Sequence, residues 1–138
     1  MMNNWVPSTS MANFTIKNLK EVEDSAAQRG PEIEARFGRK HLDSEHLGVS
    51  YFRYAAGYRA PFGHRHREQE EAYVVVSGSG RVKLDDEIVE LREWDVIRVA
   101  PAVVRAFEGG PQGLELIAIG SDRPEGGDGE MVKEFWTD

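Results

Sequence analysis

"GYRAPFGHRHREQEEAYVVVSGSG", residues 57–80, places two histidines one residue apart and follows them with acidic side chains, three valines and a glycine-rich turn. Side chains alternate between the two faces of a β-strand, so His64 and His66 are expected to point to the same side. The next strand pattern puts Glu71 and Tyr73 together on one of its faces. The segment therefore predicts two strands that could bring two imidazoles and a carboxylate together.

Two imidazoles and one carboxylate form a set that suits iron(II), manganese, nickel or zinc. Three glutamates are candidates for the carboxylate: Glu68, Glu70 and Glu71. A surface interpretation stays open at this point, because two histidines one residue apart in a charged segment are often an ordinary surface pair.

Short strand patterns continue on both sides of this segment. They alternate apolar and polar residues and are separated by turn residues such as Asp85-Asp86 and Gly109-Gly110-Pro111. No helical pattern interrupts them, which makes a parallel α/β sheet a poor fit. Many short strands with tight turns indicate an all-β sandwich or barrel. The patterns are "HLGVSYFRYAAG" (46–57), "GRVKLDDEIVEL" (80–91), "WDVIRVA" (94–100) and "GLELIAIG" (113–120).

The two ends of the chain differ from this pattern. "NLKEVEDSAAQRG" (18–30) predicts a short helix, because Gly30 followed by Pro31 is a typical C-terminal stop. Near the C-terminus, Phe135 and Trp136 are apolar residues that could attach a polar segment to the body of the domain. We therefore divide the chain into a flexible extension (1–12), a β-barrel domain (13–122), and a polar loop with a docked tail (123–138).

Composition and charge exclude several classes of protein. The 138 residues fit one domain with a core of its own. A net charge of −7 argues against a nucleic-acid or anionic-membrane partner, since both need a basic surface. The absence of cysteine excludes disulfides, thiolate zinc sites and cysteine nucleophiles. The N-terminal residues lack a basic and then apolar signal pattern, so a cytoplasmic protein is expected.

The residues of the opening segment resemble the first motif of the cupins, which are small antiparallel barrels of the double-stranded β-helix, or jelly-roll, type. That motif has a glycine, two histidines one apart, a glutamate three or four residues later, and a glycine after six more. Gly57, His64, His66, Glu71 and Gly78 match it. One departure is the spacing of the first glycine from the first histidine, which is six residues rather than five.

The resemblance continues through Pro101 and Phe107 and covers about residues 45–120, but the second motif departs from the family pattern. Metal-binding cupins usually supply a histidine there as a fourth ligand, and this chain has Arg105 at that position. The resemblance implies an all-β jelly-roll barrel with a short N-terminal helix, which pairs as a homodimer. It also implies His64, His66 and Glu71 as metal ligands.

Arg105 leaves three arrangements open, because a guanidinium cannot ligate a cation. It could clamp an anionic substrate beside a metal ion held by the other three residues. It could replace the metal by pairing with Glu71, leaving the histidines to bind a small anion. It could also lie outside the barrel mouth, beside an idle site. A guanidinium about 5 Å from a divalent ion costs roughly 6–7 kcal/mol at an effective dielectric near 20, unless an anion lies between them.

Two functions follow from these arrangements. The first is the binding of a small anionic metabolite in the barrel interior, with Arg105, Tyr73 and Phe52 as ligand-binding residues and a divalent metal (Fe, Mn, Ni or Zn) as a candidate cofactor. The alternative is a metal-dependent enzyme of the dioxygenase or the sugar or keto-acid isomerase class. The sequence does not decide whether the protein is an enzyme, because this barrel hosts many chemistries.

Overall fold

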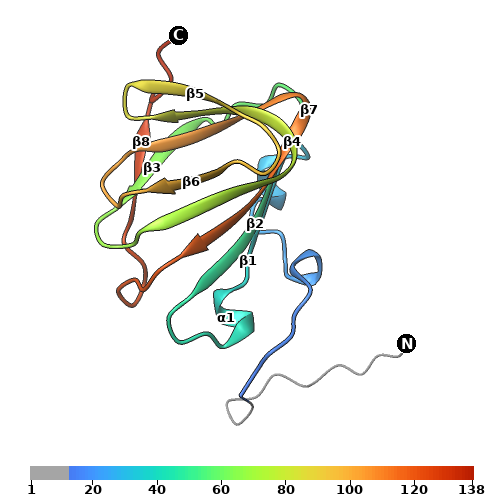
Figure 1. Ribbon diagram of the computed structural model, residues 1–138, viewed down its shortest axis with the longest axis vertical. Helices are drawn as coiled ribbons and strands as arrows, with labels where there is room; N and C mark the ends of the chain where they lie inside the picture. Colours follow the sequence, from blue (N-terminus) through green and yellow to red (C-terminus); the bar gives the residue numbers. More distant parts are fainter. Residues whose placement is uncertain (1–12) are drawn as a thin grey trace.

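The computed structural model describes residues 13–138, and the extension expected at residues 1–12 lies outside the described residues. Eight strands form one antiparallel, strongly curled sheet (Figure 1). The all-β, jelly-roll prediction is therefore confirmed. The strands are β1 (Ile33–Phe37), β2 (Gly48–Tyr54), β3 (Phe62–His66), β4 (Glu71–Leu84), β5 (Glu87–Leu91), β6 (Val96–Val99), β7 (Arg105–Gly120) and β8 (Gly129–Lys133).

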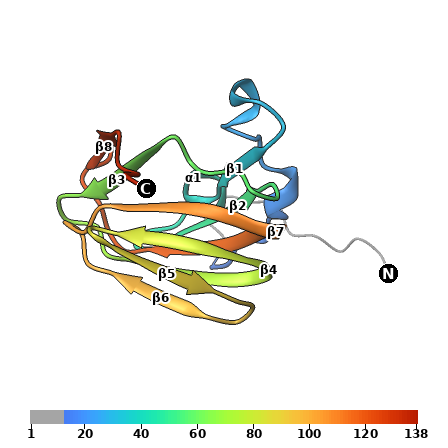
Figure 2. The ribbon, with the colours of Figure 1, turned by 90° about the horizontal axis from the view of Figure 1, so that it is seen from above.

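The two long strands, β4 and β7, hold the barrel together. They pair with each other over most of their length and bend, so that each belongs to both halves of the sheet (Figure 2). Residues 114–120 of β7 lie between β2 and the first part of β4, which in turn pairs with β6. Residues 105–109 lie beside the second part of β4, which pairs with β5, and β3 joins β7 at Arg105. The interior is the space between these halves.

A glycine permits the bend between the two halves. The register between β4 and β7 shifts on either side of Gly78, whose φ is 79°. A Cβ atom there would lie 2.1 Å from the carbonyl oxygen of Gly113 on β7, and L-residues rarely adopt this backbone conformation. The glycine that matches the end of the cupin motif therefore stands where the two long strands leave no room for a side chain.

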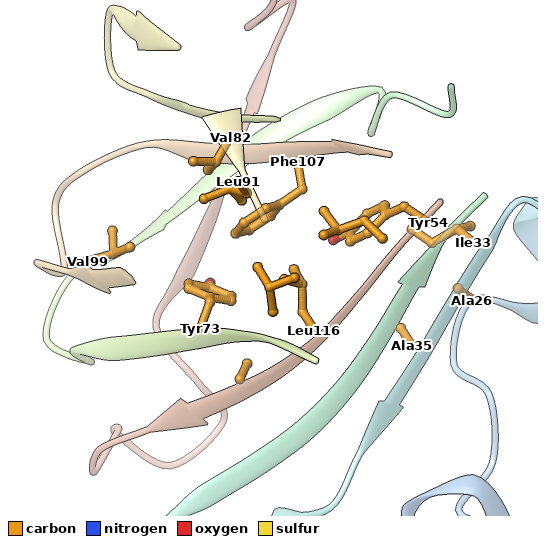
Figure 3. Packing of buried hydrophobic residues seen from close by; sticks show 13 residues of the cluster. Ala26, Ile33, Ala35, Tyr54, Tyr73, Val82, Leu91, Val99, Phe107 and Leu116 are labelled. Carbon is orange, nitrogen blue, oxygen red and sulfur yellow. The ribbon is translucent and has the colours of Figure 1, made fainter. Parts of the chain in front are cut away.

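Apolar side chains from both halves form the core (Figure 3). Val75, Val82 and Leu116 are fully buried, and the Tyr73 and Phe107 rings lie with their centroids 4.9 Å apart. These residues occupy alternate positions of their strands, which is the pattern expected when one face of a sheet is buried. Several core residues, among them Tyr73 and Phe107, also form part of the wall of a cavity in the barrel.

The short N-terminal helix is present as two separate 3-10 turns, Leu19–Glu21 and Ala27–Arg29. Asp24 lies between them, and its carboxylate accepts hydrogen bonds at 2.9 Å from the backbone N–H groups of Ala26 and Ala35. These bonds fasten the segment to β1 and compete with helical ones. One α-helical turn, α1 (Arg39–Leu42), follows β1.

No helix within residues 13–138 is long and apolar enough to cross a membrane.

The C-terminal tail contributes a strand of its own, which the sequence analysis did not predict. β8 pairs with β3, the strand of the two histidines (Figure 1). Beyond it, Phe135 is 9% exposed and its carbonyl oxygen accepts a hydrogen bond from the buried Lys83 Nζ. Trp136 Nε1 donates to the carbonyl oxygen of Ala60 at 2.9 Å. The tail thus lies against both β3 and the loop before it.

We predict that Phe135→Ala lowers the free energy of unfolding by about 3–5 kcal/mol, because it removes a buried aromatic ring and leaves a cavity. The measurement is urea-induced unfolding. Phe14→Ala is the matched control, since Phe14 is 57% exposed, and its cost should stay below about 1 kcal/mol. Equal losses in the two variants would show that the tail adds nothing to the stability of the barrel.

Candidate metal and anion site

A cavity of about 480 Å³ lies in the barrel, and its wall combines apolar core residues with charged side chains. Residues of β1, β2, β3, β4 and β7 contribute to its wall, together with segments near both ends of the described chain. Every residue that the sequence analysis proposed for the site lies on this wall: Phe52, His64, His66, Glu71, Tyr73 and Arg105.

His64, His66 and Glu71 lie close enough together to hold a metal ion. One potential ligand atom from each lies within 4.8 Å of the others, and they form the one group of this kind among residues 13–138. Glu71 Oε1 is 3.3 Å from His66 Nε2 and 3.8 Å from His64 Nε2. Strand alternation explains the arrangement, because both histidines project from one face of β3 toward the first residue of β4.

The Glu71 carboxylate is a half-buried negative charge surrounded by donors. Tyr73 Oη donates a hydrogen bond to Oε1, and Arg105 Nη2 lies 3.3 Å from the same oxygen. Burial alone would raise the pKa of Glu71, but its contacts with His64, His66 and Tyr73 outweigh burial and hold that pKa far below the usual range. Glu71 is therefore ionised at neutral pH.

Arg105 points into the barrel, so the arrangement that placed it outside the mouth is excluded. It is the cross-strand partner of His64, which puts both side chains on the same side of the sheet. Its side chain is fully buried, and Nη1 donates to the carbonyl oxygens of Val103 (2.7 Å) and Pro101 (3.3 Å). Its Nε and Nη2 have no hydrogen-bond acceptor within the described chain.

Asp128 fixes the orientation of the His66 ring. Its Oδ1 lies 2.8 Å from His66 Nδ1, and its Oδ2 accepts hydrogen bonds from the backbone N–H groups of Glu68 (2.6 Å) and Gln69 (2.9 Å). Burial opposes ionisation of Asp128, but these hydrogen bonds hold its pKa below the usual range. An ionised carboxylate only accepts, so Nδ1 must carry a proton. A carboxylate behind a ligating histidine is a frequent feature of metal sites.

The other nitrogen of His66, Nε2, faces Glu71 without a hydrogen-bond partner. Contact with Glu71 is the main cause that raises the pKa of His66, against the opposing effect of burial, and Asp128 adds to it. A metal ion binds Nε2 only when that nitrogen carries no proton, as in the neutral form of His66 with its proton on Nδ1. The site therefore offers the same nitrogen either to a proton shared with Glu71 or to a metal.

Asp128 was missed by the sequence analysis because its role depends on strand pairing. It precedes β8 in a glycine-rich acidic loop and is brought to the site by the pairing of His66 with Gly129. A single acid in such a loop gives no local sign of its function. The alternative carboxylates lie elsewhere: Glu70 pairs with Arg98 at 2.7 Å on the surface, and Glu68 is exposed.

Tyr73 and Phe52 form part of the cavity wall in different ways. Tyr73 is 2% exposed, and burial followed by the nearby Glu71 charge raises its pKa, so it remains a hydroxyl donor to that carboxylate. Phe52 is half-buried and packs edge-to-face against Phe37, with ring centroids 5.5 Å apart. Tyr73 thus supports Glu71, whereas Phe52 offers an apolar surface.

We predict that Asp128→Asn moves the proton of neutral His66 from Nδ1 to Nε2, because the new amide can turn its NH2 group toward Nδ1 while its oxygen keeps the backbone hydrogen bonds. Long-range 1H–15N spectra of the imidazoles, recorded at a pH where His66 is neutral, distinguish the two tautomers. Asp122→Asn is the control, since Asp122 lies 3.0 Å from His46 Nδ1 at an exposed position. An unchanged His66 tautomer in Asp128→Asn would show that Asp128 does not determine which nitrogen of His66 carries the proton.

Comparisons with known proteins agree with the fold described above. No family model matches the chain, and no curated protein sequence matches it significantly. Many solved structures do match. A cupin protein from Bacteroides fragilis has a TM-score of 0.66 and 22% identity, over 93% of this chain and 91% of that chain.

Two further structures are similar over most of their length. An RmlC-like cupin from Shewanella frigidimarina has a TM-score of 0.62 and 22% identity, covering 83% of this chain and 95% of that one. The polyketide cyclase RemF from Streptomyces resistomycificus has a TM-score of 0.68 and 19% identity, covering 90% of this chain and 87% of that one. At these identities the similarity establishes the fold alone, which is the curled antiparallel barrel seen in these cupin structures.

Proposed function

We propose that the cavity binds a small anionic molecule through Arg105. The supporting observation is that the Arg105 side chain is fully buried and lines the cavity, and that its Nε has no acceptor in the described chain. Its Nη2 makes no hydrogen bond there either and has only the ion pair with Glu71 Oε1 at 3.3 Å. An unmet charged donor in a protein interior is costly. The planar edge of a guanidinium matches a carboxylate or phosphate, which would accept both hydrogen bonds at once.

The size and lining of the cavity support a small ligand. About 480 Å³ lies within the range usual for metabolite sites. Phe52 and Phe37 give one part of the wall an apolar character, and His64, whose side chain is 42% exposed, adds a polar group that a ligand can reach. These features fit a short organic acid better than a bare inorganic anion.

A divalent ion is a second proposed occupant, held by His64, His66 and Glu71. The donor set fits iron, manganese, nickel or zinc. The orphaned His66 Nε2, with its ring held from behind by Asp128, is the observation in favour. Such an ion would act as a Lewis acid toward an oxygen of the bound molecule. The protein groups would orient that molecule, with Arg105 on its anionic end.

Arg105 makes the two proposed occupants depend on each other. Glu71 Oε1 already lies 3.3 Å from Arg105 Nη2, so any ion that Glu71 holds is close to a second positive charge. An anion between them reduces this repulsion. The ion and the anion should therefore each raise the affinity for the other by the same factor.

A metal-dependent enzyme is the second candidate function, of the dioxygenase or the sugar or keto-acid isomerase class. The buried pair of His66 and Asp128 favours it, because such pairs orient metal-ligating histidines. The structurally similar proteins include several enzymes, the polyketide cyclase among them. Turnover that requires an added divalent ion would support this candidate, whereas saturable binding without conversion would support the binding function alone.

We predict that Arg105→Gln weakens the binding of short carboxylates by roughly 30-fold, because one charge-assisted hydrogen bond contributes about 2 kcal/mol. The probes are acetate, butyrate and hexanoate, titrated by calorimetry. Arg105→Lys keeps the charge but lacks the planar fork, and should bind with intermediate affinity. Thermal unfolding confirms that each variant is folded. Equal affinities in wild type and both variants would contradict the proposal.

We also predict that Arg105→His raises the affinity for a divalent ion by about tenfold or more, since even ~1.4 kcal/mol of relieved repulsion gives one order of magnitude. Elemental analysis of protein purified without chelators, together with titration of manganese, nickel and zinc, measures the effect. His64→Ala, combined with Arg105→His, should lose the gain. An unchanged affinity for the divalent ion in Arg105→His would show that Arg105 does not influence metal binding at His64, His66 and Glu71.

A further inference from the structure

Most of the arginines that are not in an ion pair with a carboxylate lie around the cavity. The chain has 12 arginines, all within residues 13–138. Eight of them have a carboxylate oxygen within 4.0 Å. Of the other four, three line the cavity: Arg29, Arg39 and Arg123. Arg92 is the one that does not. In an acidic protein, unpaired guanidinium groups thus collect around a single cavity.

Arg39 and Arg123 lie on the wall of the same cavity, and Arg39 bonds to the backbone two residues before Arg123. Burial and then the positive charge of Arg123 lower the pKa of Arg39, whereas the charges of Asp122 and Glu71 oppose this shift. Arg39 Nη2 donates one hydrogen bond, at 2.6 Å, to the carbonyl oxygen of Ser121. No carboxylate of residues 13–138 lies within salt-bridge distance of either arginine. Two guanidiniums on one cavity wall, neither of them in a direct ion pair, are a suitable place for an anion.

The fold keeps space for Arg39 at this position. Gly48 on β2 and Gly120 on β7 are cross-strand partners beside its guanidinium. A Cβ atom on Gly48 would lie 2.6 Å from Arg39 Nη2, and one on Gly120 would lie 3.6 Å from it. A side chain on Gly48 would therefore displace the guanidinium, so this glycine lets Arg39 extend from α1 along the sheet to the cavity.

We propose that Arg39 and Arg123 form a second anion subsite in the same cavity, so that the ligand carries two anionic groups on a short, partly apolar skeleton. This inference rests on the proposed function, in which Arg105 holds the first anionic group. Arg105 begins β7, whereas Arg39 lies in α1 and Arg123 follows β7, so different elements supply the two subsites. Phe37 and Phe52 on the shared wall match the skeleton. The ligand class is a dicarboxylate or a phosphorylated carboxylate.

A structural role is the competing explanation for Arg39, since its bond to Ser121 joins α1 to the end of β7. Arg123 allows the two explanations to be separated. Its side chain is exposed and has no hydrogen bond within the described chain, so its replacement should leave the fold unchanged. Arg92 supplies the matched control, because it is also exposed and unpaired but lies outside the cavity.

The test compares ligands of equal carbon number with one or two carboxylates: butyrate with succinate, pentanoate with glutarate, and hexanoate with adipate. Glycerate and 3-phosphoglycerate form the phosphorylated arm. Affinities are measured by calorimetry at constant ionic strength. In wild type, the best dianion should bind at least about tenfold more tightly than its monoanion. Arg123→Gln and Arg39→Gln should each reduce this ratio below about threefold, and Arg92→Gln should leave it unchanged.

The outcomes separate this inference from the function on which it rests. If monoanions bind in a way that depends on Arg105, but the matched dianions bind no more tightly, the second subsite is overturned and the proposed function stands. If no carboxylate or phosphorylated acid binds, both are overturned. If Arg92→Gln lowers the ratio as much as Arg123→Gln does, overall charge explains the preference and the subsite is again overturned.

Discussion

The polar side chains of the cavity depend on one constraint, which is the negative charge of the partly buried Glu71 carboxylate. A partly buried carboxylate must be compensated by nearby positive charges or hydrogen-bond donors. Here Tyr73, His66 and Arg105 supply this compensation at one oxygen, Oε1. They come from three strands, and β3 is paired with β7 at only one position, His64 with Arg105, within the described chain. Contacts to Glu71 therefore connect parts of the sheet that backbone pairing joins weakly.

The same arrangement explains how Arg105 can stand where a metal-binding cupin would have a fourth ligand. Arg105 stabilises the ionised form of Glu71, as a bound metal ion would. Because its positive charge belongs to the chain, this stabilisation does not require an ion from solution. Its cost is that Nε has no acceptor and that Nη2 has only the ion pair with Glu71, without a hydrogen bond. An anion that enters the cavity removes this cost. Under the proposed function, an arginine at this position would shift the preference of the site from a cation alone toward an anion, or toward both together.

Features that depend on local periodicity could be predicted from the sequence. Alternation placed His64 and His66 on one side of a strand but left three glutamates open. The motif resemblance selected Glu71, which lines the cavity, whereas Glu70 pairs with Arg98 on the surface. Alignment of the second motif placed Arg105 near them. The 3-10 turns could not be predicted in the same way, because the hydrogen bond from Ala35 to Asp24 is a tertiary contact 11 residues distant in sequence.

The missed site residues have a common physical reason. Asp128, Arg39 and Arg123 lie outside the strands that contain the motif and reach the cavity through the folding of loops and termini. Their residue types are frequent on any charged surface, so nothing in the local sequence distinguishes them. What distinguishes them is their partners: Asp128 meets a buried histidine, whereas the two arginines meet no carboxylate.

Net charge and local charge therefore lead to different conclusions in this protein. The value of −7 describes the surface, where acidic side chains neutralise most arginines in pairs that add little to stability. A ligand inside the cavity is influenced mainly by the groups within a few ångströms, because interactions between exposed charges are screened over about 8–10 Å in physiological salt. Those groups include four arginines and two histidines against Glu71 and Glu130, and Glu130 already pairs with Arg65. An acidic protein can thus hold an anion, provided that its folding separates the arginines of the cavity from the carboxylates of the surface.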